Sequence, residues 1–217
     1  ATDLDGTFLD SSGRVSELNQ QAVLAAAEQG VVTVIATGRP PRWLDGVLDA
    51  LRSARPKVIA SNGALVYDLD TRQLKRIHPL PTEATLEYAN RLQRAVPDVN
   101  FAVEYPDGWG REPAFAPRQD RAVADTVDGL EDLLANGRAV KLLAASESLT
   151  TQQLAGVGQP LAEDLLTCTY SFVSQQGLLE LSAPGVTKGT ALAGVLDELG
   201  VSRAGVAAFG DMPNDWD

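Results

Sequence analysis

The chain has 217 residues, 44% of them hydrophobic and 22% charged, which is ordinary for a globular protein with a sizeable core. The 29 acidic and 18 basic residues give a net charge of −11, which disfavours nucleic acid or an anionic membrane as a partner. The single His78 and single Cys168 exclude a multi-His metal site, a Cys-based zinc cluster and an internal disulfide. Any metal site must therefore use mainly oxygen ligands, which suits Mg²⁺ or Ca²⁺.

The first part of the chain alternates helix and strand patterns. Ser16 is a plausible N-cap, and Gly30 ends the helical spacing that follows it. We expect helices at 16–29 and 43–51, and buried strands at 31–36 and 57–60. This rhythm predicts a parallel sheet with helices on its faces.

A change of character follows Tyr67. Residues 68–81 are polar and end in a Pro-Leu-Pro sequence, which favours a linker. The elements expected next are helices at 83–95, 128–135 and 148–156, strands at 99–105, 139–144, 166–173 and 177–182, and a loop at 106–118. The last two strands, joined by residues 174–177, suggest an antiparallel hairpin. A helix at 188–199 and a strand at 205–209 resume the first pattern.

The predicted fold is therefore an α/β, Rossmann-like parallel-sheet core interrupted by an inserted α+β domain. We assign residues 1–81 and 182–217 to the core and residues 82–181 to the insertion. Short hinges are expected near 79–82 and 182–185. No apolar run is long enough for a membrane helix and no signal peptide is visible, so we expect a cytoplasmic protein. The sequence gives no indication of the oligomeric state.

Acidic residues gather where strands of the core should end. Asp3 and Asp5 lie two residues apart, and Asp211 and Asp215 follow the last predicted strand. Ligands of open parallel sheets bind at this carboxyl edge, so these segments should converge there. Clustered carboxylates repel one another unless some are protonated or a cation lies between them, and Mg²⁺ is the simplest such cation. An EF-hand loop is excluded because its twelfth position would be Arg14.

The same segments resemble, in order, the sequence motifs of the haloacid dehalogenase (HAD) superfamily of phosphohydrolases. The matching stretches are DLDGT at 3–7, VIATGR at 34–39, VTKG at 186–189 and GDMPND at 210–215, with SNGA at 61–64 in addition. The position and composition of the insertion resemble the cap domain of the Cof-type, subclass IIB members, which are sugar-phosphatase-like. The resemblance implies a Mg²⁺-dependent phosphatase acting on a small phosphorylated metabolite.

The resemblance also implies roles for individual residues. Asp3 would be the nucleophile that forms an aspartyl-phosphate, and Asp5 the general acid and base. Thr37 would hydrogen-bond a phosphoryl oxygen and Lys188 would neutralise charge on Asp3 and the phosphoryl group. Asp3, Asp211 and the backbone carbonyl of Asp5 would bind Mg²⁺.

Further residues would contact phosphate or substrate or support the others: Gly6, Gly38, Arg39, Asn62, Gly63, Asn214 and Asp215. Asn214 and Asp215 would orient Lys188 or a metal-bound water. Two alternatives stay open for Arg39, which could bind phosphate or pair with a carboxylate. Asn62 and Gly63 could line the substrate pocket or only make a turn.

Two alternative functions would use a similar set of residues. A phosphomutase or phosphotransferase would use the same intermediate and deliver it to another hydroxyl group. A non-enzymatic phospho-aspartate switch also uses Asp, Thr and Lys, but the acid/base Asp5 and the large insertion argue against it. A P-loop is excluded because Thr187, not glycine, precedes Lys188.

The ends of the sequence suggest a longer protein. A strand of about five residues should precede Asp3, yet only Ala1 and Thr2 do so. The resemblance also implies more sheet and helix beyond Asp215. We therefore expect this sequence to be part of a longer chain.

Overall fold

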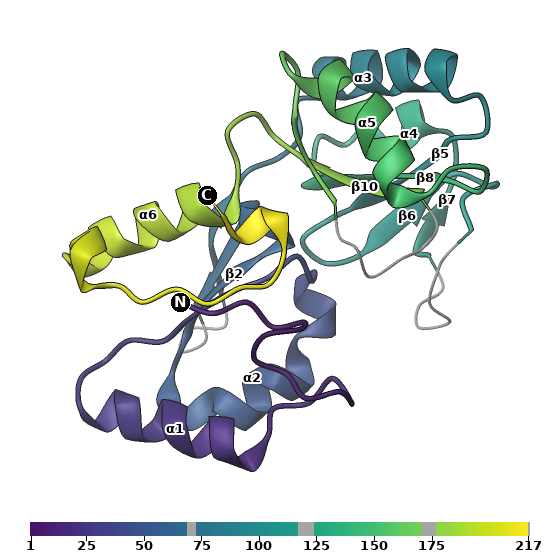
Figure 1. Ribbon diagram of the computed structural model, residues 1–217. Coiled ribbons are helices and arrows are strands. Elements are labelled where there is room, and N and C mark those ends of the chain that lie inside the picture. The colour runs from purple at the N-terminus through teal and green to yellow at the C-terminus, as the bar shows by residue number, and fades with distance from the viewer. Residues whose placement is uncertain (69–72, 117–123, 171–176, 217) are drawn as a thin grey trace. The chain divides into compact units, whose positions relative to one another are not determined.

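The computed structural model describes residues 1–68, 73–116, 124–170 and 177–216. It has a mixed α/β architecture, as the sequence predicted, and its contacts divide the chain into two compact units. One unit comprises Ala1–Ile77 and Val186–Asp217, and the other comprises His78–Gly185. Figure 1 shows the elements of both units.

The first unit is built on a four-stranded sheet in the order β1-β2-β3-β4. Its strands are β1 (Val34–Ala36), β2 (Lys57–Ala60), β3 (Leu65–Asp68) and β4 (Gln73–Ile77). Strands β1 and β2 are parallel, whereas β2, β3 and β4 pair antiparallel. The sheet is extended beyond β1 by Thr2, which bridges Ile35 on one side and Phe209 on the other. This extension joins both ends of the chain at the point where the acidic motifs begin.

Helices cover both faces of this sheet. Helix α6 (Lys188–Leu199) lies on one side of β2, while α1 (Glu17–Glu28) and α2 (Asp45–Leu51) lie on the other (Figure 1). Ala191 and Val195 of α6 pack on a buried cluster that includes Val34 and Ile59. Helix α1 begins where Ser16 accepts a hydrogen bond from the Asn19 N–H, as expected of an N-cap. Short 3₁₀ turns complete the unit: η1 (Pro41–Trp43), η2 (Arg52–Ala54), η3 (Ser61–Gly63), η4 (Arg203–Gly205) and η5 (Pro213–Asp215).

The second unit is built on a six-stranded sheet in the order β7-β6-β5-β8-β10-β9. The strands are β5 (Asn100–Glu104), β6 (Trp109–Arg111), β7 (Thr126–Val127), β8 (Lys141–Ser146), β9 (Thr167–Thr169) and β10 (Gly177–Ser182). Strands β9 and β10 pair antiparallel, as expected, while most of the connecting turn (residues 171–176) lies outside the described residues.

The helices of the second unit gather on one face of its sheet. They are α3 (Thr82–Ala95), α4 (Leu130–Leu134) and α5 (Thr151–Ala162) (Figure 1). Tyr88 and Leu92 of α3 join Leu154 of α5 in a large buried cluster with alternate strand residues such as Phe101 and Leu142. The strand positions that alternate with these carry a buried charged group, in which Lys141 Nζ lies 3.8 Å from Glu104 and 3.3 Å from Glu180. Burial of the apolar cluster stabilises this unit.

Some expected elements are wrong in extent or kind. Residues 73–77 were expected in a linker but form β4, an edge strand whose alternating half-exposed side chains explain its polar sequence. The strand expected at 31–36 begins only at Val34, and Val31 and Val32 are 57% and 45% exposed. In place of a strand at 205–209 there is a single bridge, between Phe209 and Thr2. The core sheet is therefore only partly parallel.

Within the described ranges, every helix falls short of the length or the apolar character needed to cross a membrane.

Candidate active site

Asp3 lies at the carboxyl edge of the first unit's sheet. The Thr2 N–H donates to the Val34 carbonyl, and the Thr2 carbonyl accepts from the Ala36 N–H, both at 2.9 Å. On the other side, the Asp3 N–H donates to the Phe209 carbonyl at 3.0 Å. These bonds hold Asp3 between β1 and the segment that leads to the C-terminal acidic motif. Its side chain is only 5% exposed.

Lys188 is the cation that faces Asp3. It is the first residue of α6, whose start is fixed by a capping box between Thr187 and Thr190. Its ammonium lies 2.7 Å from Asp3 Oδ1 and 2.8 Å from Asp215 Oδ1. All three side chains are largely buried. Burial raises the pKa of Asp3, and Lys188 opposes that rise. The single Lys188 ammonium thus pairs with two buried carboxylates, those of Asp3 and Asp215.

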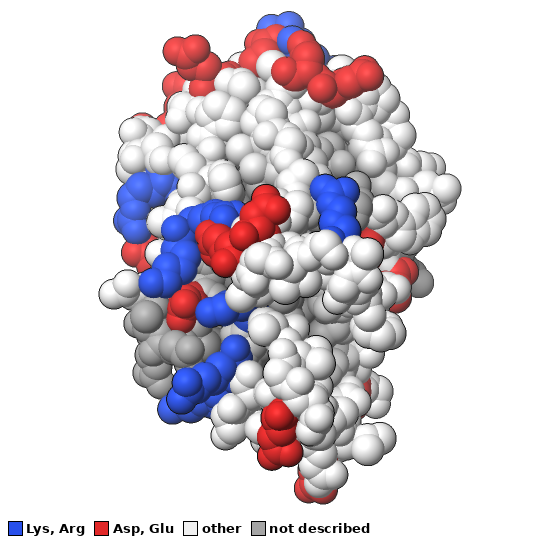
Figure 2. Space-filling view, turned by 90° about the vertical axis from the view of Figure 1, so that its left-hand side faces the viewer, with Lys and Arg blue, Asp and Glu red and all other residues white. Residues whose placement is uncertain are grey.

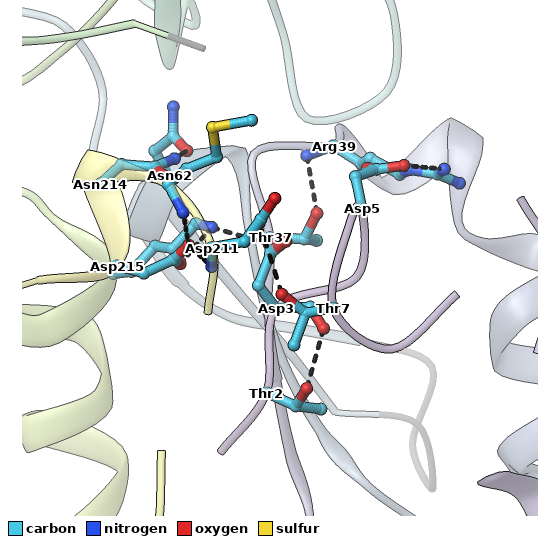
Figure 3. A network of polar contacts seen from close by, with 12 residues as sticks. Thr2, Asp3, Asp5, Thr7, Thr37, Arg39, Asn62, Asp211, Asn214 and Asp215 are labelled. Atoms are coloured by element: carbon cyan, nitrogen blue, oxygen red, sulfur yellow. Dashed lines mark hydrogen bonds and ion pairs between the residues drawn. The ribbon is translucent and has the colours of Figure 1, made fainter. Parts of the chain in front are cut away.

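Asp211 completes an acidic group with Asp3 and Asp215. One carboxylate oxygen from each lies within 4.8 Å of the others. Asp211 reaches this position because Gly6 has no side chain: a Cβ there would lie 2.1 Å from Asp211 Oδ2. The donor set consists of hard oxygen ligands on a site that is partly buried, which fits Mg²⁺. Figure 3 shows these side chains converging from the two ends of the chain.

Asp5 turns away from this acidic group. Its carboxylate accepts a two-pronged contact from Arg39, with Nε at 2.7 Å and Nη2 at 2.5 Å (Figure 3). This contact raises the pKa of Arg39. Of the two roles left open for Arg39, the structure shows pairing with a carboxylate. The Asp5 side chain is 49% exposed, so it is accessible to solvent and substrate.

Thr37 directly follows β1 and is 1% exposed. Its N–H donates to the Ile59 carbonyl at 2.9 Å, and its hydroxyl accepts from the Arg39 N–H at 3.1 Å. Gly38 lies between the two in this turn. The hydroxyl is thereby held at the same sheet edge as Asp3.

Asn62 and Gly63 lie in the buried turn η3, after β2. The Asn214 side-chain amide donates to Asn62 Oδ1 at 3.1 Å, so the structure brings Asn214 to Asn62 rather than to Lys188. Of Asn214 and Asp215, only Asp215 is seen to contact Lys188 among the described hydrogen bonds. The Asp215 Oδ2 also accepts hydrogen bonds from the Asp211 and Met212 N–H groups.

Thr7 was given no role from sequence, although it closes the first motif. Its hydroxyl lies 3.4 Å from Asp211 Oδ1 and donates to it (Figure 3). The signal available in the sequence was the position of Thr7 directly after Gly6 in the DLDGT stretch.

Charges on the protein surface are mixed in the view of Figure 2. Basic side chains lie beside acidic ones on the face shown there, and large areas carry neither.

The comparisons with known proteins agree with the motifs. A family model described as haloacid dehalogenase-like hydrolase matches residues 1–217. The pyridoxal phosphate phosphatase YbhA of Escherichia coli (strain K12) is 26% identical over 229 residues, which cover 99% of this chain and 81% of that protein. The chloroplastic endoribonuclease YBEY of Arabidopsis thaliana is 26% identical over 243 residues, and the match spans 98% of this chain but only 38% of that protein.

Among solved structures, the HAD subclass IIB sugar phosphatase BT4131 superposes with a TM-score of 0.76 at 17% identity, covering 99% of this chain and 80% of that one. That likeness confirms the fold, a Rossmann-like core with an inserted domain. The family match, which extends over the whole sequence, shows more: the chain belongs to the haloacid dehalogenase-like hydrolase family, as a hydrolase of the phosphatase type.

Proposed function

We propose that this chain hydrolyses a small phosphate monoester, with Mg²⁺, through an aspartyl-phosphate on Asp3. The observation that carries the proposal is the buried Asp3 carboxylate, held 2.7 Å from the Lys188 ammonium and beside two further carboxylates. Asp215 also contacts Lys188, which gives the ammonium a second carboxylate partner.

In the first step, an oxygen of Asp3 attacks phosphorus as the bond from phosphorus to the leaving oxygen breaks. The leaving oxygen takes a proton from Asp5, whose carboxyl group is exposed beside the site. In the second step, Asp5 takes a proton from water, and the water oxygen attacks phosphorus and releases Asp3. The Thr37 hydroxyl and the Lys188 ammonium stabilise the charge on the phosphoryl oxygens.

Asp3, Asp211 and the backbone carbonyl of Asp5 are the residues that would hold Mg²⁺. When bound, the ion supplies positive charge that offsets the negative charge of the phosphate and the carboxylates. Asp215 is the third carboxylate of the group, but its contact with Lys188 favours a supporting role.

The substrate class follows from the relatives. YbhA is named for pyridoxal phosphate and BT4131 is a sugar phosphatase. The substrates in both names are small organic phosphates. We propose a sugar phosphate as the substrate of this chain. The second unit would act as a cap that selects the leaving group, with domain limits near 81–82 and 181–182. We place the enzyme in the cytoplasm, and propose that neither nucleic acid nor a membrane is its partner.

The test is release of inorganic phosphate from a panel of phosphorylated metabolites. Wild-type protein with Mg²⁺ should release phosphate, and EDTA should stop the reaction reversibly. Asp3→Asn should abolish turnover, while Asp10→Asn is a matched control: Asp10 is exposed and its contacts with Ser12 are local. Turnover that survives in Asp3→Asn would refute the mechanism. Positional isomers of the substrate in place of free phosphate would favour a phosphomutase.

A further inference from the structure

The turn η3 is strongly constrained, yet the proposed chemistry gives it no task. Ser61 and Asn62 have φ values of 50° and 56°, and Gly63 follows at 103°. Non-glycine residues keep such left-handed backbone only where their surroundings hold them there, often at functional sites. Ser61 is 0% and Asn62 1% exposed, so neither side chain offers a substrate much surface. The turn must act through what it touches.

Its first contact is with the loop after β1. The Asn62 N–H donates to the Thr37 carbonyl and the Ser61 N–H to the Arg39 carbonyl, both at 3.0 Å. These backbone bonds fix the loop from both ends. That loop carries the Thr37 hydroxyl. It also carries the Arg39 side chain, which hydrogen-bonds to Asp5.

The second contact is with the start of α6. A Cβ at Gly63 would lie 2.2 Å from the Thr187 carbonyl oxygen, so the glycine allows the turn to press against the N-cap of this helix. The next residue is Lys188. The close approach of Gly63 therefore helps to determine how far α6 lies from Asp3.

The third contact is made by the Asn62 side chain. Asn62 Oδ1 accepts from Asn214 Nδ2 at 3.1 Å, and Asn214 lies in η5 between Asp211 and Asp215. One turn thus touches three separate segments, and each segment carries a residue of the proposed phosphate site.

We propose that the Ser61–Gly63 turn is the positioning element of this site, and that Asn62 acts through Asn214 to hold the C-terminal acidic loop against Asp3. Asn62 is then a positioning residue and does not contact substrate. The left-handed backbone is what lets its short side chain and its N–H point to two different segments at once. This inference rests on the proposed function, because turnover is one of its readouts.

The experiment uses Asn62→Gly, which tolerates the left-handed backbone but removes the amide. We expect kcat to fall roughly 10- to 100-fold, as displaced catalytic groups commonly cause, while KM changes by less than about threefold. The loss should be equal for p-nitrophenyl phosphate and glucose 6-phosphate, since both share only the phosphoryl group. Arg55→Gly is the matched control: Arg55 is exposed, also has positive φ at 48°, and its replacement should leave kcat unchanged.

A double-mutant cycle with Asn214→Ala completes the test. The double variant should lose no more activity than the more impaired single variant, because both remove one contact. Losses that multiply, or losses that differ more than tenfold between the two esters, would overturn the proposal. If the wild-type protein cleaves no phosphate ester, the proposed function fails separately. In that case the same double-mutant cycle is measured on the free energy of urea unfolding. Additive losses of that free energy in the Asn62→Gly and Asn214→Ala variants would refute the positioning role.

Discussion

Removal of the buried ammonium of Lys188 should destabilise the protein strongly. It lies 2.7 Å from Asp3 and 2.8 Å from Asp215. At an effective dielectric constant of about 20, each of these contacts corresponds to roughly 6 kcal/mol of attraction. Desolvation of the three groups offsets most of that sum. Removing one partner of a buried pair typically costs about 3–5 kcal/mol, because the other charges are left buried and uncompensated.

We therefore predict that Lys188→Met lowers the free energy of unfolding of the first unit by about 3–5 kcal/mol at pH 7 without divalent cations. Urea titration followed by hydrogen exchange in β1 and α6 peptides measures this unit separately from the second. Lys57→Met is the matched control, since Lys57 pairs with Asp68 at 3.4 Å but is 32% exposed at the side chain, and should cost under about 1 kcal/mol.

Acidification provides a second check on the same variant. The pKa of Asp3 is raised by burial, so its buried charge penalises folding above that pKa and the penalty is relieved as the pH falls through it. Without Lys188 that penalty grows, and the difference between variant and wild type should narrow in acid. A Lys188→Met protein within 1 kcal/mol of wild type at pH 7, or a gap that widens on acidification, would refute the reasoning.

Three further predictions concern other contacts. Arg39→Ala should lower the free energy of unfolding by under about 1 kcal/mol, because the Asp5 carboxylate is half-exposed. The same substitution should lower kcat at least tenfold, and an unchanged kcat would show that the contact between Arg39 and Asp5 has no role in turnover. Burial raises the pKa of Cys168 to about 12, so at pH 8 the thiol should react with Ellman's reagent roughly a thousandfold more slowly than a free thiol, and at the ordinary rate in urea; fast native reaction would contradict its burial. Although desolvation raises it, hydrogen bonds from Ser148 and Ser146 hold the pKa of Asp98 below its ordinary range. Asp98→Ala should therefore unfold at a lower urea concentration than wild type at pH 7, and the difference should vanish as the pH falls through the lowered pKa; a constant difference down to pH 2 would argue against the carboxylate.

Local patterns were enough to predict much of the fold. Helix α6 was expected at 188–199 and has those limits; in the structure Thr187 caps its start and Gly200 its end. The strands β3, β4, β6 and β7 were missed, and β6 lies within the loop expected at 106–118. Strands β3, β6 and β7 are short, and β4 is an edge strand with polar side chains. Periodicity cannot recognise a strand whose two faces are both partly exposed.

The candidate site shows a similar division. Strand ends and motif order placed Asp3, Asp211 and Asp215 at one edge, and the structure brings their oxygens together. The sequence did not predict the directions of the side chains. That Asp5 would turn to Arg39, and Asn214 to Asn62, depends on turn geometry and on contacts between distant segments, which no local pattern specifies.

The strand-edge pairing of Thr2 with Phe209 has a consequence for how the protein is made. The segments that contribute Asp3, Lys188 and Asp211 come from the two stretches of sequence on either side of the continuous unit His78–Gly185. On the ribosome, that middle unit is complete before α6 emerges, and Thr2 cannot pair with Phe209 until Phe209 has been synthesised. Contacts between such distant residues form slowly because a long loop must close first. The proposed catalytic site should therefore assemble only after Asp211 and Asp215 have been synthesised, later than the point at which the His78–Gly185 unit can fold.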